Sequence, residues 1–203
     1  MPAIRLIAGL GNPGPQYTDT RHNVGAAFVL ALAERYHIPL AEDARFKGRL
    51  GRGTIAGHDV RLLVPTTYMN LSGESVGALA RFFKLAPEEI LVAYDEMAFE
   101  PGVLRIKSGG GDNGHNGIRS VIAGLGNERG FARLRIGVGH PGDRGRVTSY
   151  LTSVRMPEPE RALMNSVFDV PESVLKHLLG GDLEKAMTDL HSRKPPALDV
   201  RDD

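Results

Sequence analysis

The sequence predicts an α/β fold in a single domain, a three-layer sandwich whose mixed, largely parallel twisted sheet is flanked by helices. Short apolar runs typical of buried strands alternate along the chain with segments of helical periodicity, which is the pattern of parallel βαβ units. One pair of adjacent runs has the form of a hairpin, so the sheet is expected to contain antiparallel strands as well. A length of 203 residues suffices for one such domain.

The first strand is expected over residues 3–9, and it ends in the glycine-rich run GLGNPGP. The spacing G-x-G-x-x-G in this run resembles a dinucleotide-binding turn. Pro13 and Pro15 argue against that function, because proline lacks an N–H donor and because the next helix begins about ten residues too late. The run is therefore interpreted as an irregular loop at the carboxyl end of a strand, and it presents Asn12 and Tyr17.

The apolar series that begins at Val24 has a period of 3.6 residues and predicts a helix ending near Tyr36. His22 lies beside the start of this helix. The partial positive charge there disfavours an imidazolium, so the ring is expected to be neutral and able to accept a proton. A single histidine at a helix start could equally be a capping residue.

Two β-prone runs, RLGRGTIAG and HDVRLLVPT, are expected to form a hairpin with its turn at residues 56–59. A loop carrying Tyr68 and Asn70 follows, and then a helix over about 74–84. Asn70 could serve only as the cap of that helix.

The second half of the chain continues the alternation. A strand over 89–94 is followed by Asp95 and Glu96, and a glycine-rich loop precedes His115 and Asn116 at the start of a helix. The further elements are an extended segment over 103–107, a strand over 132–138 and helices over about 158–169, 171–179 and 182–191. The domain is expected to span 1–192, and the Pro-rich, charged tail 193–203 to be disordered.

Composition limits the function classes. The chain has no cysteine, which excludes disulfides, thiol nucleophiles and Cys-ligated zinc and favours a cytoplasmic location. No apolar run approaches the roughly 20 residues needed to span a bilayer, so no membrane association is expected.

The net charge of +1 is unevenly distributed, since residues 105–155 carry nine Lys or Arg against three Asp or Glu. This segment could bind a polyanion such as nucleic acid, or could be only a solvated basic surface.

Six polar side chains lie in loops at strand carboxyl ends or at the adjoining helix starts: Asn12, His22, Asn70, Asp95, His115 and Asn116. In a largely parallel sheet these loops share one edge, so a joint functional site is expected there. The sequence lacks H-E-x-x-H, Walker A and G-x-S-x-G motifs, so neither a metal, a bound nucleotide nor a serine nucleophile is predicted. An activated water is then the natural attacking group. A neutral histidine whose basicity is raised by a carboxylate would act as the base, and asparagine side-chain N–H groups would stabilise the oxyanion.

Six ordered motifs resemble the signatures of the bacterial-type peptidyl-tRNA hydrolase family. They are GLGNPGPQY, TRHNVG, PTTYMNLSG, YDE, GGGDNGHNG and RLRIGVGHPGD, and they cover residues 4 to about 145. The resemblance implies a monomeric α/β enzyme without cofactor or obligate protein partner. It also implies that the substrate is peptidyl-tRNA, whose ester bond is hydrolysed to recycle tRNA from aborted translation.

The resemblance also implies roles for individual residues. His22 matches the catalytic base, Asp95 the carboxylate that orients it, and Asn12 the residue that helps distinguish blocked from free aminoacyl groups. The remaining matches are to substrate or tRNA contacts, with the two basic residues clamping tRNA phosphates: Tyr17, Tyr68, Asn70, Asn116, His115, Lys107 and Arg135.

Departures from the family pattern affect affinity more than chemistry. Asp112 and Asn113 stand where relatives often have a smaller or His-containing pair, Ala98 replaces a frequent acidic residue, and Phe is also common at Tyr68.

Two other functions stay open. One is an RNA-binding relative that has lost catalysis, like the splicing factors of this fold in plant organelles. The other is a nucleotide-dependent enzyme built on the glycine-rich loop.

Overall fold

Seven strands form one sheet in the computed structural model, which describes residues 1–198. The strands lie in the order β2-β3-β4-β1-β5-β7-β6. β4, β1, β5 and β7 are parallel neighbours, whereas β2 with β3, β3 with β4 and β6 with β7 are antiparallel pairs. The mixed, largely parallel sheet is thus confirmed. The strands are β1 Leu6–Gly9, β2 Ala41–Asp43, β3 Gly48–Ile55, β4 His58–Pro65, β5 Ile90–Glu96, β6 Leu104–Ser108 and β7 Ala132–Gly137.

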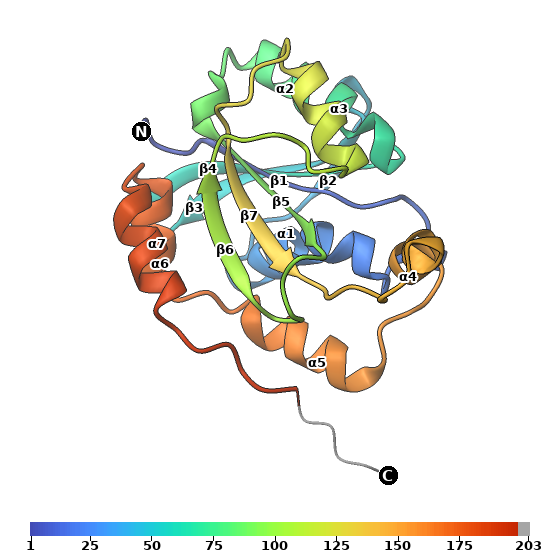
Figure 1. The fold of residues 1–203 in the computed structure, drawn as a ribbon. Coiled ribbons are helices and arrows are strands. Elements are labelled where there is room, and N and C mark those ends of the chain that lie inside the picture. The colour runs from blue at the N-terminus through green and yellow to red at the C-terminus, as the bar shows by residue number, and fades with distance from the viewer. Residues whose placement is uncertain (199–203) are drawn as a thin grey trace.

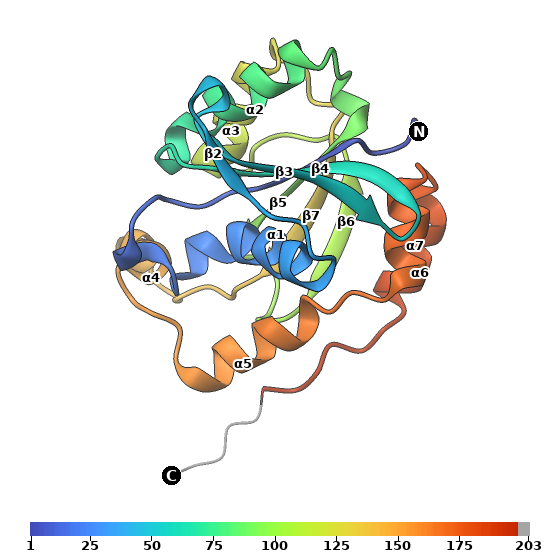
Figure 2. The same cartoon turned by 180° about the vertical axis from the view of Figure 1, so that it is seen from behind.

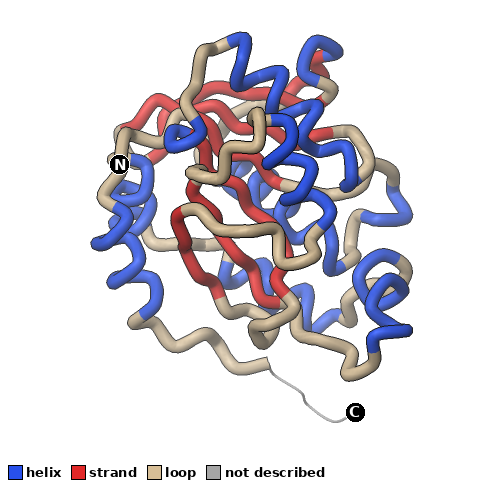
Figure 3. The backbone as a smooth tube through the Cα atoms, turned by 45° about the horizontal axis from the view of Figure 1, so that its top comes forward, coloured by secondary structure: helices blue, strands red, loops and turns tan. Residues whose placement is uncertain are grey.

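Helices cover both faces of this sheet (Figures 1 and 2). α2 and α3 lie over one face, and α1 and α5 lie over the other, with α6 and α7 beside β6 at one end of that layer. Figure 3 shows the strands as the middle layer between helices, so the predicted three-layer sandwich is confirmed. The helices are α1 Val24–Arg35, α2 Ser72–Phe82, α3 Asn116–Gly124, α4 Val147–Thr152, α5 Glu158–Val167, α6 Glu172–Leu179 and α7 Leu183–His191.

Two hydrophobic cores lie on the two faces of the sheet. Ile7 of β1 packs into the core beneath α1 and α5, whereas its neighbours Leu6 and Ala8 point into the core beneath α2 and α3. Successive side chains of a strand alternate between faces, and here both faces are buried. This explains why the central strands are continuous apolar runs.

Paired glycines let helices approach the sheet and one another closely. A Cβ atom at Gly9 would overlap the carbonyl oxygen of Gly25, and one at Gly25 would overlap that of Ala93. The start of α1 therefore sits directly on β1 and β5, which brings His22 to the end of β5. In the same way Gly73 of α2 meets the backbone of α3, which fixes the loops that begin these two helices.

Several elements differ from the prediction. The hairpin turn consists of Ala56 and Gly57 alone, both with positive φ, because β4 already begins at His58. β2 and α4 were not predicted, since neither the polar run after Pro39 nor the six residues of α4 show a clear period. The three C-terminal helices are confirmed with bounds shifted by up to two residues.

The C-terminal tail can be compared with its prediction only in part. Residues 194–198 contain neither helix nor strand, and residues 199–203 of the predicted disordered tail lie outside the described part of the chain. Within residues 1–198, no helix combines the length and apolar character that crossing a membrane requires.

Candidate active site

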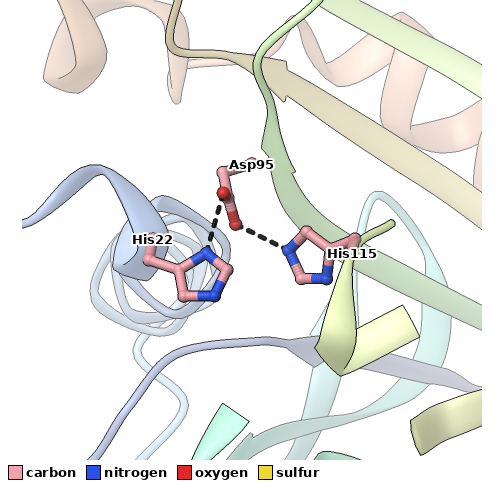
Figure 4. Close-up of side chains that lie close together, drawn as sticks. All are labelled: His22, Asp95 and His115. Atoms are coloured by element: carbon pink, nitrogen blue, oxygen red, sulfur yellow. Dashed lines mark hydrogen bonds and ion pairs between the residues drawn. The ribbon is translucent and has the colours of Figure 1, made fainter. Parts of the chain in front are cut away.

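His22, Asp95 and His115 form one hydrogen-bonded cluster at the carboxyl edge of the sheet (Figure 4). His22 lies in a 3-10 helix, Arg21–Asn23, that leads directly into α1, and Asp95 is near the end of β5. The Asp95 carboxylate accepts from His22 Nδ1 at 2.8 Å and, through its other oxygen, from His115 Nε2 at 2.8 Å. The predicted convergence of these three side chains is therefore found.

The cluster is nearly shielded from solvent. The Asp95 side chain is 2% exposed, that of His115 9% and that of His22 11%. Burial alone would raise the pKa of Asp95, but the adjacent His115 and His22 rings hold it well below its usual range. Asp95 is therefore ionised and acts only as an acceptor.

The tautomers of both rings follow from their partners. His115 caps α3 by accepting the backbone N–H of Ile118 at Nδ1, so its proton is on Nε2, which donates to Asp95. His22 donates through Nδ1, and its Nε2 is an acceptor with no hydrogen-bond partner among residues 1–198. Of the two rings, only His22 can therefore accept a proton from a substrate water without losing a hydrogen bond.

The helix start was expected to lower the pKa of His22 and keep the ring neutral, but the pKa is shifted in the opposite direction. Burial lowers the pKa of His22, but the charge and hydrogen bond of Asp95 outweigh that effect, and the pKa is raised above 6.5. A carboxylate at hydrogen-bond distance in a buried site is a stronger influence than a helix terminus, which contributes about 0.3–1 kcal/mol at an exposed position. Asp95 thus makes His22 a stronger base, which agrees with the expectation of a histidine whose basicity a carboxylate raises.

The same three side chains are also those in residues 1–198 that could hold a metal ion, because their ligand atoms lie within 4.8 Å of one another. Their hydrogen bonds favour a hydrogen-bonded base over a metal site. A metal would have to displace the proton of His115 Nε2 and that of His22 Nδ1, since ligand atoms must be deprotonated. The absence of a metal from the reaction remains a prediction.

A cavity of about 320 Å³ opens beside the cluster. Asn116 at the start of α3 lines it, as do Glu96, the last residue of β5, and Met97, which follows it. The opposite wall is α4, which sequence analysis missed because the helix is short and has no apolar period. The lining residues supplied by α4 are Val147, Thr148, Leu151 and Thr152.

The three predicted asparagines occupy different positions. Asn116 faces the cavity, but Asn12 and Asn70 do not line it. Asn12 accepts the backbone N–H of Met69 through Oδ1 at 2.8 Å, which leaves its Nδ2 group without a partner among residues 1–198. Asn70 is exposed in the 3-10 helix Met69–Leu71, and no side-chain hydrogen bond caps the helix behind it. Capping therefore does not explain Asn70.

Met69 connects the asparagine loops to the cluster. A Cβ atom at Gly117 would meet both the Met69 sulfur and the His115 ring, so these side chains lie against the same turn of α3. The loop of Asn70 and the start of α3 are therefore neighbours. Asn12 joins them through its hydrogen bond to Met69.

The two predicted tyrosines lie outside this cavity. Tyr68 is 56% exposed, which leaves its ring available for stacking. Tyr17 is half-buried in the 3-10 helix Pro15–Tyr17, and its carbonyl accepts from the Thr20 hydroxyl. Neither has a side-chain hydrogen bond within the described residues.

Lys107 and Arg135 lie on the edge pair β6–β7. The register places Lys107 opposite Arg133 and Arg105 opposite Arg135, so four cations share one face of this pair. Arg133 is 1% exposed and donates to the carbonyls of Gly110 and Gly111, so it holds the glycine-rich loop. The basic segment 105–155 is therefore not uniformly available to a polyanion.

Arg135 lines a second, open cleft that continues from the cavity. The two share Glu96, Met97 and Asn113 as lining residues. In this second cleft the Arg135 guanidinium lies 4.8 Å from the centre of the Phe99 ring. The structure therefore offers one path from the His22 cluster to a predicted phosphate-binding cation.

Two of the departures from the family pattern also have local partners. Asp112 accepts the backbone N–H of Gly114 and lies 3.4 Å from Arg119, so its charge is partly balanced beside the cavity. The backbone N–H of Ala98 donates to Glu96, an acidic residue that remains at this strand end.

Known proteins resemble this chain over nearly its whole length. A family model described as peptidyl-tRNA hydrolase matches residues 6–197. A protein named peptidyl-tRNA hydrolase from Pseudomonas aeruginosa (strain LESB58) is 51% identical over 194 residues, which are 96% of this chain and 100% of that protein. The protein of the same name from Shewanella frigidimarina is 50% identical over 194 residues, covering 96% and 99%. The crystal structure of peptidyl-tRNA hydrolase from Acinetobacter baumannii superposes with a TM-score of 0.89 at 48% identity and covers 95% of this chain and 97% of that one.

Proposed function

Since the chain belongs to the peptidyl-tRNA hydrolase family of enzymes, we propose that it hydrolyses the ester bond of peptidyl-tRNA with a water molecule that His22 activates. The observation that carries this proposal is the buried contact of His22 Nδ1 with Asp95, which leaves Nε2 without a hydrogen-bond partner within residues 1–198. No covalent intermediate and no metal take part. The products are a free peptide and a tRNA that can be charged again.

The proton transfers follow from this geometry. His22 Nε2 takes a proton from water as the oxygen attacks the ester carbonyl, and Asp95 stabilises the imidazolium that forms. The same ring then gives the proton to the departing ribose oxygen of the tRNA. The free Nδ2 group of Asn12, together with the Asn70 and Asn116 amides, is suited to hold the substrate and the developing oxyanion.

His115 has a positioning role in this scheme besides any contact with the substrate. Its two ring nitrogens are occupied by Ile118 and Asp95, so it anchors the Asp95 carboxylate to the start of α3. A carboxylate held by two N–H donors has little freedom to rotate. This keeps the second oxygen in place for His22.

The proposal is tested by incubating the purified protein with peptidyl-tRNA in the absence of any cofactor. Released peptide and deacylated tRNA should appear in equal amounts, and a chelator should not slow the reaction. If the protein bound tRNA but released no peptide, it would be an RNA-binding relative without catalysis. A requirement for an added nucleotide would instead favour the glycine-rich loop as the binding site, although the first α-helix after this loop begins only at Val24.

We further propose that the cleft beyond the cavity guides the tRNA, with Lys107 and Arg135 each neutralising a phosphate. Support comes from their shared sheet face and, for Arg135, from the continuity of the two clefts; Lys107 lines neither cleft. The enzyme is proposed to act as a monomer in the cytoplasm, where ribosomes supply its substrate.

Replacing Lys107 and Arg135 together with alanine is expected to raise KM for peptidyl-tRNA and to spare kcat. Each lost phosphate contact should reduce the slope of log affinity against log salt by about 0.7–0.9. A small ester that ends before the clamp should be cleaved as fast as by the wild type. Lys176→Ala removes an exposed cation on α6 and serves as the control. If KM and the salt slope were unchanged in the double variant, Lys107 and Arg135 would not contact the tRNA, and this face of β6–β7 would be only a solvated basic surface.

Alanine at Asn12 or Asn70 is expected to lower kcat/KM on peptidyl-tRNA. The reason is that Asn12 Nδ2 and the Asn70 amide are free to act on substrate. The melting temperature should change little for Asn70→Ala and fall modestly for Asn12→Ala, which also removes the acceptor of the Met69 N–H. Kinetics and thermal unfolding should be measured on the same preparations. A variant that lost about 1 kcal/mol of stability and kept its kcat/KM would behave as a lost helix cap instead.

A further inference from the structure

Arg21, the residue before His22 in the chain, forms a buried ion pair with Glu160. Arg21 donates from Nε and Nη2 to the two carboxylate oxygens of Glu160 at 2.9 and 2.8 Å, and both residues are 6% exposed. Arg21 immediately precedes His22 in the 3-10 helix, whereas Glu160 belongs to α5. The proton transfers described above do not use this pair.

The same guanidinium also contacts α4. Arg21 Nη1 donates to the carbonyl of Tyr150 at 3.3 Å, and its Cζ lies 3.9 Å from the centre of the Tyr150 ring. The Tyr150 hydroxyl donates in turn to the carbonyl of Val138, just beyond β7. One side chain thus joins three parts of the molecule: the turn of the base, the cavity wall and α5.

Backbone contacts of the two residues before Arg21 reinforce this junction. Thr20 forms an isolated antiparallel bridge with Arg155, and the N–H of Met156 donates to the carbonyl of Asp19 at 2.9 Å. The segment between α4 and α5 is therefore laid along the residues that precede His22. A displacement of α4 would be transmitted to the base through these contacts.

Two physical arguments give the ion pair a positioning role. α4 has only six residues, too few to be stable by itself, so its place depends on tertiary contacts. A buried ion pair is no more stabilising than well-packed apolar side chains of the same volume, but the two parallel hydrogen bonds of an arginine and a carboxylate fix direction and distance. We propose that Arg21 and Glu160 are positioning residues that set the distance between His22 and the α4 wall of the cavity. This inference rests on the proposed role of His22 as the base.

The test compares the double variant Arg21→Met/Glu160→Met with the wild type well below their melting temperatures. An apolar pair of similar length should keep the protein folded while removing the directional link. We expect kcat on peptidyl-tRNA to fall by about 10- to 100-fold, because a misplacement of about 1 Å has effects of that size. The apparent pKa of His22 in the profile of kcat/KM against pH should shift as well, since the His22 contact with Asp95 changes.

If the double variant does not fold, the nearly isosteric variant Glu160→Gln takes its place. The same two quantities are measured on it: kcat and the apparent pKa of His22 in the profile of kcat/KM against pH. Leu178→Ala serves as the stability control, because Leu178 is buried in α6 away from the site. This variant should lower the melting temperature and leave both kcat and the pH profile unchanged. A loss of kcat in Leu178→Ala equal to that of the ion-pair variants would assign their defect to stability alone.

His22→Ala is measured in the same assay to separate the two proposals. Activity retained by His22→Ala would overturn the proposed function itself. A folded ion-pair variant with wild-type kcat and pH profile, beside an inactive His22→Ala, would overturn only the positioning role.

Discussion

His22→Ala is expected to lower kcat on peptidyl-tRNA by about 10²- to 10⁴-fold, the usual effect of removing a general base. His115 cannot take over, because its Nδ1 accepts from Ile118 and its Nε2 donates to Asp95. Folding and tRNA binding should be preserved, since the His22 side chain is not part of either hydrophobic core. Single-turnover rates and a tRNA-binding titration measure the two effects separately.

His58→Ala is a matched control for this variant. His58 begins β4, at the opposite end of that strand from the site, and its loss should leave kcat unchanged. If His22→Ala instead retained near-wild-type hydrolysis, the base would have to be sought elsewhere, and His115 would be the next candidate despite its two hydrogen bonds.

The site edge could be predicted from the sequence because of the topology of parallel sheets. Asp95 follows an apolar strand, while His22 and His115 precede helices, and the carboxyl ends of β1 and β5 lie at one edge. The proximity of His22 and Asp95 follows from that arrangement, but the position of His115 does not. β6 is antiparallel to β7, so its last residue, Ser108, lies opposite Ala132 at the other edge of the sheet, and the loop over 109–115 has to return to the site. The order of the three side chains, with Asp95 between the two rings, depends on side-chain geometry that no motif contains.

Other features gave no signal in the sequence. The contact of Arg21 with Glu160 joins residues 139 positions apart, and nothing in either local pattern distinguishes them from surface charges. Arg133 counted toward the basic segment, yet it is buried against the glycine-rich loop. The wall formed by α4 was missed because VTSYLT has three β-branched residues among six and no helical period.

The sign of the His22 pKa shift is a further case. The sequence showed the helix start next to His22, but not the distance to Asp95, and a contact of 2.8 Å in a buried site decides the outcome. The local sequence showed the helix start, which has the weaker effect on this pKa, and did not show the contact with Asp95, which has the stronger one.

Asp95→Asn is expected to lower kcat by about 10²-fold, less than His22→Ala does, because the imidazole stays in place. An asparagine has one acceptor oxygen where Asp95 receives N–H groups from both His22 and His115. Its amide group would face one of these rings, which would have to change its tautomer or turn away. The base is then held in a mixture of orientations.

The same variant should also change the pH dependence. The pKa of His22 is raised above 6.5 chiefly because burial is outweighed by the Asp95 carboxylate, so kcat/KM of the wild type rises with pH through a pKa above that value. Without the carboxylate this pKa falls, and the rising limb moves to lower pH. The extra stability that protonated His22 gains from Asp95 is fully present below pH 6.5 in the wild type and is lost as the pH rises through the folded-state pKa. The free energy of unfolding of the variant should therefore depend less on pH in this range.

Profiles of kcat/KM and urea unfolding between pH 5 and 9 measure both effects. Asp59→Asn, which removes an exposed carboxylate paired with Arg52 on the hairpin, controls for the loss of one negative charge. This control should keep the wild-type kcat and the wild-type position of the rising limb. If Asp95→Asn behaved like Asp59→Asn in both measurements, Asp95 would be only an acid at the end of a strand, and the raised pKa of His22 would need another source.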